Sequence, residues 1–289
     1  MEILALVAAT KKKLHRFLCI LLLQATIVGA YELPTVGDQH AVFTTKKNSR
    51  TKPTAFFVDV LHDIGSMYRN LIDWDSYKTV VATFPLYAAS SLIDRPIHEQ
   101  FYDDHLHKNI KQMPSGLVFF AEHVAIPLEA TAASAIFLFA SDKRLRETSK
   151  MFIVGLPFVV WTADLIKVAF KSNCCFRPLH ERFSKNHKRC YGGFPSAHAA
   201  QVTFAAALFG LQYGAPAIVP LSIIGALVVS AFINDNRHYV SQIVAGGGLG
   251  VLYALAASKV VDKKIDSSFN VSVSSTINGS PALQLAYNF

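Results

Sequence analysis

Apolar residues along the chain gather into stretches that are long enough to form helices and are separated by polar breaks. They cover residues 80–92, 117–140, 151–170, 199–211 together with 218–233, and 243–261. Proline, glycine, asparagine and charged residues mark the breaks, as they do at helix ends. Because short connections join antiparallel neighbours, the pattern predicts an all-α antiparallel bundle of about six helices.

The first 30 residues have the pattern of a targeting segment. A basic region that includes Lys11 and Arg16 precedes an apolar run over residues 17–28, which ends in small residues at Gly29 and Ala30. This order is typical of a signal peptide. The apolar run is also close to the shortest length that spans a membrane, so a signal peptide and an uncleaved signal anchor both remain open.

Two further segments flank the helical region of residues 79–262. Residues 31–78 form an exported lead-in segment with an amphipathic helix, since residues 56–72 carry apolar side chains at helical spacing. Residues 263–289 form a tail in which apolar and polar residues alternate on both sides of Asn278-Gly279. That alternation predicts a small C-terminal β-hairpin.

Composition favours a membrane protein over a soluble bundle, although the soluble bundle remains the alternative. Of the 289 residues 52% are hydrophobic and only 17% charged, which is an apolar excess for a soluble domain. The few charged groups inside the apolar stretches would then have to face the bundle interior. They include Glu122, Glu129, Asp164 and Lys167.

The net charge of +8 and the pI near 9.3 suit an anionic partner such as lipid, nucleic acid or a phosphorylated substrate. No P-loop, dinucleotide motif or nucleic-acid module is present, so a nucleic-acid partner is not expected. Basic clusters at residues 143–150 and 259–264 fall at one end of the predicted bundle. The positive-inside tendency makes that end cytoplasmic.

Cysteine usage adds one hypothesis to this picture. Cys19 lies in the targeting segment, whereas Cys174, Cys175 and Cys190 lie in a long basic loop at residues 171–193. Exported proteins meet an oxidising compartment. A disulfide from Cys190 to either Cys174 or Cys175 would close that loop.

Three clusters of chemically capable residues fall at the end of the bundle opposite the basic clusters. They are Lys171 with Arg177-Pro178, then Pro195-Ser196-Ala197-His198, then Arg237-His238 followed by Gln242. The helix after His198 runs away from this end, and the next helix returns to it just before His238. The topology therefore predicts that all three clusters meet.

Phosphate-ester hydrolysis needs cations, a nucleophile and an acid for the leaving oxygen. Lys171 and Arg177 supply charge, and Ser196 with the helix start after it forms an anion site. Two histidines can divide the nucleophile and acid roles near neutral pH. No set of metal ligands with suitable spacing is present, so neither a metal nor a cofactor is expected.

These motifs resemble those of the type 2 phosphatidic acid phosphatase (PAP2) superfamily, whose pattern is K-x6-R-P, P-S-G-H and S-R-x5-H-x3-D. The resemblance covers roughly residues 151–261. It implies a six-helix bundle and a metal-independent phosphatase in which His238 forms a phosphohistidine and His198 is the general acid. Lys171, Arg177, Ser196, Ala197 and Arg237 are the expected phosphate-binding residues, and Gln242 completes the catalytic set.

The chain departs from the family pattern at five places. Lys171 stands one residue too close to Arg177, and Ala197 replaces the glycine. Ala231 and Phe232 replace the serine and the arginine, and Gln242 replaces the aspartate. The leading hypothesis is hydrolysis of a phosphate monoester or pyrophosphate, of a lipid or another phosphate ester. The enzyme would act at the bacterial inner membrane with a site facing the periplasm, or as a soluble periplasmic protein. The alternative is a catalytically impaired member that binds phosphorylated lipid.

Overall fold

The computed structural model describes residues 53–103, 108–109, 113–170, 193–235, 237–267, 269–275 and 281–287. The predicted targeting segment, the three loop cysteines, Lys171 and Arg177 lie outside the described residues. The chain divides into two compact units, Met1–His62 and Asp63–Phe289. The first is described only from residue 53, so the fold is that of the second unit.

Helices make up most of the described chain, which confirms the all-α fold class. The helix that crosses the unit boundary is α2 (Pro53–Asn70). The others are α3 (Trp74–Phe101), α4 (Ser115–Phe119), the π-helical turn η1 (Phe120–Val124), α5 (Ala125–Phe139), α6 (Lys143–Phe170), α7 (Ala197–Tyr213), α8 (Ala215–Asn234) and α9 (Val240–Asp266).

Four short strands complete the described elements. Strand β1 (Tyr102–Asp103) pairs antiparallel with β2 (Lys108–Asn109). In the C-terminal tail, β3 (Phe269–Ser275) pairs antiparallel with β4 (Pro281–Tyr287), with Phe269 opposite Tyr287 and Ser275 opposite Pro281. This pairing is the hairpin that the alternating pattern of the tail predicts.

Two helix boundaries differ from those expected from the apolar stretches. Helix α6 begins at Lys143 rather than near Met151, because charged side chains are good helix formers and the Asp142 carboxylate accepts the Leu145 N–H at 2.6 Å. Helix α3 continues through Pro96 to Phe101 instead of ending before residue 94. Its Asp94 is held by α9, as described below.

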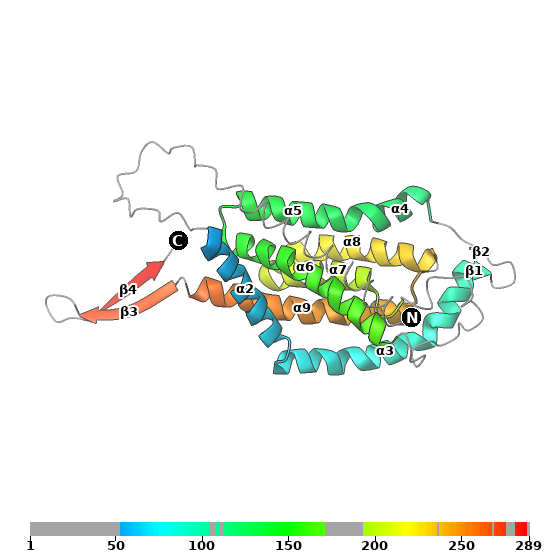
Figure 1. Ribbon diagram of the computed structural model, residues 1–289, viewed down its shortest axis with the longest axis horizontal. Helices are drawn as coiled ribbons and strands as arrows, with labels where there is room; N and C mark the ends of the chain where they lie inside the picture. The colour runs from blue at the N-terminus through cyan, green and yellow to red at the C-terminus, as the bar shows by residue number, and fades with distance from the viewer. Residues whose placement is uncertain are drawn as a thin grey trace, which may run out of the picture. The chain divides into compact units, whose positions relative to one another are not determined.

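Helix α7 is the centre of the bundle and packs against α6, α8 and α9 (Figure 1). Its contact with α9 is made through glycine, which lets two helix backbones approach closely. A Cβ added at Gly246 would lie 2.2 Å from the carbonyl oxygen of Ser196, and one at Gly250 would lie 2.4 Å from that of Ala200. The starts of α7 and α9 are therefore in direct backbone contact.

We expect Gly246→Ala to lower the free energy of unfolding by about 1–3 kcal/mol, the usual cost of overpacking a well-packed contact. The matched control is Gly247→Ala, whose Cβ would meet only Thr203 Oγ1, at 3.6 Å. That variant should be neutral or stabilised by up to about 1 kcal/mol, because alanine forms helix better than glycine. Thermal unfolding of the purified protein measures both, and equal stabilities would contradict the close contact.

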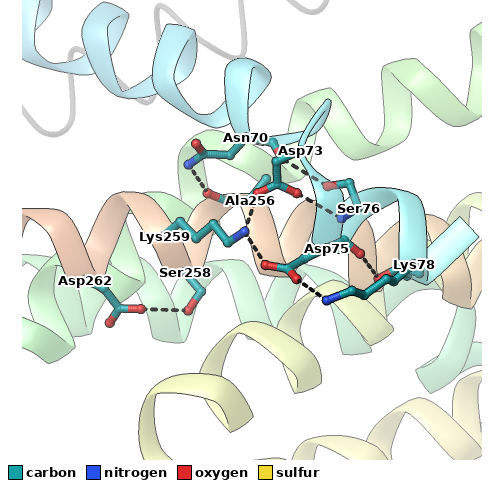
Figure 2. A network of polar contacts seen from close by, with 10 residues as sticks. Asn70, Asp73, Asp75, Ser76, Lys78, Ala256, Ser258, Lys259 and Asp262 are labelled. Carbon is teal, nitrogen blue, oxygen red and sulfur yellow. Dashed lines mark hydrogen bonds and ion pairs between the residues drawn. The ribbon is translucent and has the colours of Figure 1, made fainter.

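The end of the bundle where α9 finishes is held by ion pairs and hydrogen bonds. Lys259 of α9 donates to Asp73 and, at 2.6 Å, to Asp75, and Asn70 donates to the carbonyl of Ala256 at 3.1 Å (Figure 2). These contacts fasten the turn between α2 and α3 onto α9. The α2–α3 connection therefore cannot move independently of the last helix.

The two basic clusters predicted to share one end do so. Arg144, in the first turn of α6, donates to Gln212 at 2.9 Å near the end of α7 and to Asp262 at 3.4 Å near the end of α9. Lys150 and Lys264 both contact the buried carboxylate of Asp63, at 2.8 and 2.6 Å. This end is opposite the one where α7 and α9 begin.

Four helical segments are long and apolar enough to cross a membrane, judged by length and composition. They are Ser115–Phe139, Lys143–Ala169, Ala215–Asn234 and Val240–Asp266. Large apolar side chains remain exposed on them, for example Phe139, Val219 and Ile223. These features suggest a membrane protein.

Candidate active site

Three helix termini meet at one end of the bundle and bring together two of the three predicted motifs, whereas the motif of Lys171 and Arg177 lies outside the described residues. Helix α8 ends at Asn234, and helices α7 and α9 begin at Ala197 and Val240. The backbone N–H of Ser196 donates to the carbonyl of Gln242 at 3.0 Å, which joins the two helix starts. As a result the rings of His198 and His238 lie 6.4 Å apart between centroids.

His238 is oriented by the residue that stands in place of the family's aspartate. Its Nδ1 lies 3.2 Å from Oε1 of Gln242, and the same oxygen accepts the backbone N–H of Tyr239 at 3.2 Å. With the proton on Nδ1, the Gln242 oxygen accepts its hydrogen bond and Nε2 is the unprotonated ring nitrogen. A neutral amide oxygen stabilises a cationic imidazole less than a carboxylate does.

His198 lies in the first turn of α7, outside the four candidate spans, and packs on an apolar ring. Its centroid is 4.3 Å from that of Phe232, the residue at the family's arginine position. Burial, with smaller contributions from the charges of Lys167 and Arg237, lowers the pKa of His198 to about 4. His198 is therefore neutral at pH 7, and a bound phosphate would favour its protonation.

This pKa gives a prediction for stability. In the unfolded chain His198 takes up a proton near pH 6.5, but in the folded protein only near pH 4. The folded state should therefore lose the contribution of His198 to its stability as pH falls from about 6.5 to 4. We expect the apparent Tm of the wild type to fall more over this window than that of His198→Gln, measured in the same detergent. Parallel curves would show that the ring titrates normally.

Ser196 forms the N-cap of α7 and is itself buried. Its hydroxyl oxygen accepts the Ala199 N–H at 3.3 Å, and its carbonyl accepts the Ala200 N–H at 3.0 Å. Ala197 follows as the first residue of the helix and is also buried. Backbone N–H groups at a helix start point toward the site and favour a bound anion.

Arg237 is held by carboxylates on both sides. It makes two hydrogen bonds to Glu122 of η1, one of them at 2.8 Å, and a third to Asp235. The hydrogen bonds that Arg237 donates to Glu122 are the main cause that raises the pKa of Arg237. Because Glu122 belongs to η1, these hydrogen bonds hold the segment before His238 against the α4–η1–α5 helix. Arg237 thus has a structural role in addition to its position beside the site.

Three residues of this end were not identified as site residues from the sequence. Lys167, in the last turn of α6, is close enough to His198 to contribute to its pKa, and it donates to Asp164 at 3.1 Å. The buried carboxylate of Asp94 accepts the Ser241 N–H at 2.9 Å, and its own pKa is raised by burial. Glu122 pairs with Arg237, as described above.

For two of these three residues, Lys167 and Glu122, the sequence gave a partial indication of a role at the site. Lys167 and Glu122 are charged residues inside apolar stretches, and such residues normally face the interior of a bundle. Asp94 gave no such signal, because Asp94-Arg95-Pro96 has the composition of a helix break. Its role depends on a contact with Ser241, which lies 147 residues away in the chain.

The described chain is therefore a helical bundle with two histidines and a capped helix start together at one end. Residues 151–266 match the family model of the PAP2 superfamily. Its members are typically phosphatases, so the family suggests phosphatase-type activity. No curated protein and no solved structure matches the chain.

Proposed function

We propose that the protein is a phosphatase that hydrolyses a phosphate monoester or pyrophosphate of a membrane lipid through a phosphohistidine on His238. The observation that carries the proposal is the meeting of His198, His238 and Ser196 at one end of a PAP2-type bundle. In the tautomer that donates from Nδ1 to Oε1 of Gln242, 3.2 Å away, Nε2 of His238 would be the atom that attacks phosphorus.

The remaining roles follow from position. A phosphate beside His238 would lie near the start of α7, whose amides and Ser196 would bind its oxygens. Lys167 contributes positive charge from α6, and Lys171, Arg177 and Arg237 are the other proposed cations. His198, protonated when the dianion is bound, would donate its proton to the leaving oxygen.

A second function is favoured by a specific observation. Phe232 packs on His198 where the family has arginine, and Gln242 replaces the aspartate. Loss of one preorganised donor costs about a hundredfold to a thousandfold in rate. A chain that lacks both groups would bind phosphorylated lipid and turn it over slowly or not at all.

We also propose an orientation at the bacterial inner membrane. The positive-inside tendency makes the end with Arg144, Lys150 and Lys264 cytoplasmic, so the histidine end would face the periplasm. All three of these side chains form ion pairs with carboxylates, which partly balance their charge. Labelling of single cysteines at each end with a membrane-impermeant thiol reagent, in a variant without the native cysteines, tests the orientation.

The experiment that tests the activity is release of inorganic phosphate by the purified, detergent-solubilised protein without added metal. Phosphatidic acid, an isoprenyl pyrophosphate and a short water-soluble phosphate ester form the panel. Release from any of them supports catalysis. If none is hydrolysed while phosphatidic acid still binds, the protein is a lipid-binding member of the superfamily.

A further inference from the structure

A groove runs along the bundle between α8 and α9, with α7 as its floor. Within the described residues α7 packs closely on both α8 and α9, whereas those two helices hardly touch each other. The groove has a volume of about 310 Å³. Val202 lies on its floor, Ala226 and Val229 on the α8 wall, and Val244 and Gly247 on the α9 wall.

The groove begins one helical turn below the candidate active site on all three helices. Val202 follows His198 by four residues along α7, which is about one turn of 5.4 Å. On α8 and α9, Val229 and Val244 lie one turn from Ile233 and Val240, which line a small cavity together with His238. The groove and the histidines therefore lie about one helical turn apart along the same three-helix segment.

The lining is suited to hydrocarbon. Most of the groove residues are apolar, and small side chains on both walls leave the space open. Helices α8 and α9 are both candidate membrane spans, so the open side of the groove would face the hydrocarbon of a bilayer. A lipid chain that moves from the bilayer into the groove gains little hydrophobic free energy, so the groove would act mainly by aligning the substrate.

From this one-turn alignment and the apolar lining we infer that the groove between α8 and α9 binds one hydrocarbon chain of a phosphorylated lipid whose phosphate lies at His198 and His238. The inference rests on the proposed function, because it takes the phosphate site as given. It deepens that function by selecting a long-chain phosphate ester over a soluble one. It also names Ala226 and Gly247 as residues that determine chain binding.

Photo-crosslinking tests the groove without any turnover. The probe is a phosphonate analogue of phosphatidic acid that cannot be hydrolysed and carries a diazirine in its acyl chain. The full-length protein is placed in phosphatidylcholine nanodiscs, and labelled peptides are mapped by mass spectrometry. We expect labelling of α8 and α9 at the groove, reduced at least tenfold by excess phosphatidic acid and unaffected by added phosphatidylcholine.

Two tryptophan variants on α8 separate the groove from the rest of the lipid-facing surface. Ala226→Trp fills the groove and should reduce the specific labelling about tenfold, whereas Ile223→Trp, at an exposed position outside the lining, should not. Labelling spread over α5 and α6 and unchanged by Ala226→Trp would overturn the inference, because the groove would then hold only bulk lipid.

Phosphate release from phosphatidic acid is measured on the same preparations. Specific labelling without release would sustain the groove and refute the proposed hydrolysis. If a soluble ester is hydrolysed, this release is unaffected by Ala226→Trp and the labelling is unspecific, the proposed hydrolysis would be supported and the groove refuted. The two failures are therefore distinguishable.

Discussion

His238→Ala should release inorganic phosphate at less than roughly a thousandth of the wild-type rate, since it removes the nucleophile that the mechanism requires. The residual binding site would stay in place, because the contact between Ser196 and Gln242 is made by the backbone. The measurement is initial phosphate release without added metal, at saturating substrate.

The control for this variant is His62→Ala, which removes an exposed histidine of α2 far along the chain from the motifs. It should keep the wild-type rate. A trapping experiment with a ³²P-labelled substrate and rapid acid-free quenching should detect phosphohistidine in the wild type. Full activity of His238→Ala would refute the proposed nucleophile.

Restoring the family residues should produce the second large effect. We expect Phe232→Arg combined with Gln242→Asp to raise kcat/KM by roughly a hundredfold to a thousandfold. The position is suitable, because the Phe232 ring lies 4.3 Å from His198 and 5.8 Å from His238 between centroids. The aspartate would replace the amide that now contacts Nδ1.

A matched variant separates charge from loss of the aromatic ring. Phe232→Met has similar length to arginine without its charge, and it should lower stability without raising the rate. Phe232 is buried in a cluster with Val202 and Val228, so both variants should be less stable than the wild type. If arginine and methionine lower the rate equally, the site does not use the family's arginine chemistry.

The same double variant distinguishes the two proposed functions. If the natural protein only binds phosphorylated lipid, activity should appear for the first time in Phe232→Arg with Gln242→Asp. If the natural protein is already a phosphatase, activity should increase from a measurable level. Both outcomes require that lipid binding survives the substitutions, which the crosslinking probe measures directly.

The helices and the convergence of the histidine motifs could be predicted from the sequence, because both depend on local patterns. Apolar periodicity locates the helices, and the alternating directions of α7, α8 and α9 place His198 and His238 at one end. The start of α6 lies earlier than the apolar pattern predicts, because residues 143–150 are charged rather than apolar and yet form helix readily.

The contacts around the site could not be predicted, because they join residues that are far apart in the chain. Arg237 and Glu122 are separated by 115 residues, and Asp94 and Ser241 by 147. Each pair depends on how whole helices pack, which hydrophobic periodicity does not specify. The π-helical turn that carries Glu122 also has no clear sequence signal.

The glycine contact between α7 and α9 has a consequence for how this lineage can diverge. The starts of α7 and α9, beside which the two histidines lie, meet backbone to backbone, with Gly246 against Ser196. Substitution of side chains outside this contact would leave the spacing of the two helix starts unchanged. A chain could in this way carry Phe232 and Gln242 in place of an arginine and an aspartate and still hold both imidazoles at the same end of the bundle. Few substitutions would then be needed to restore or change its chemistry.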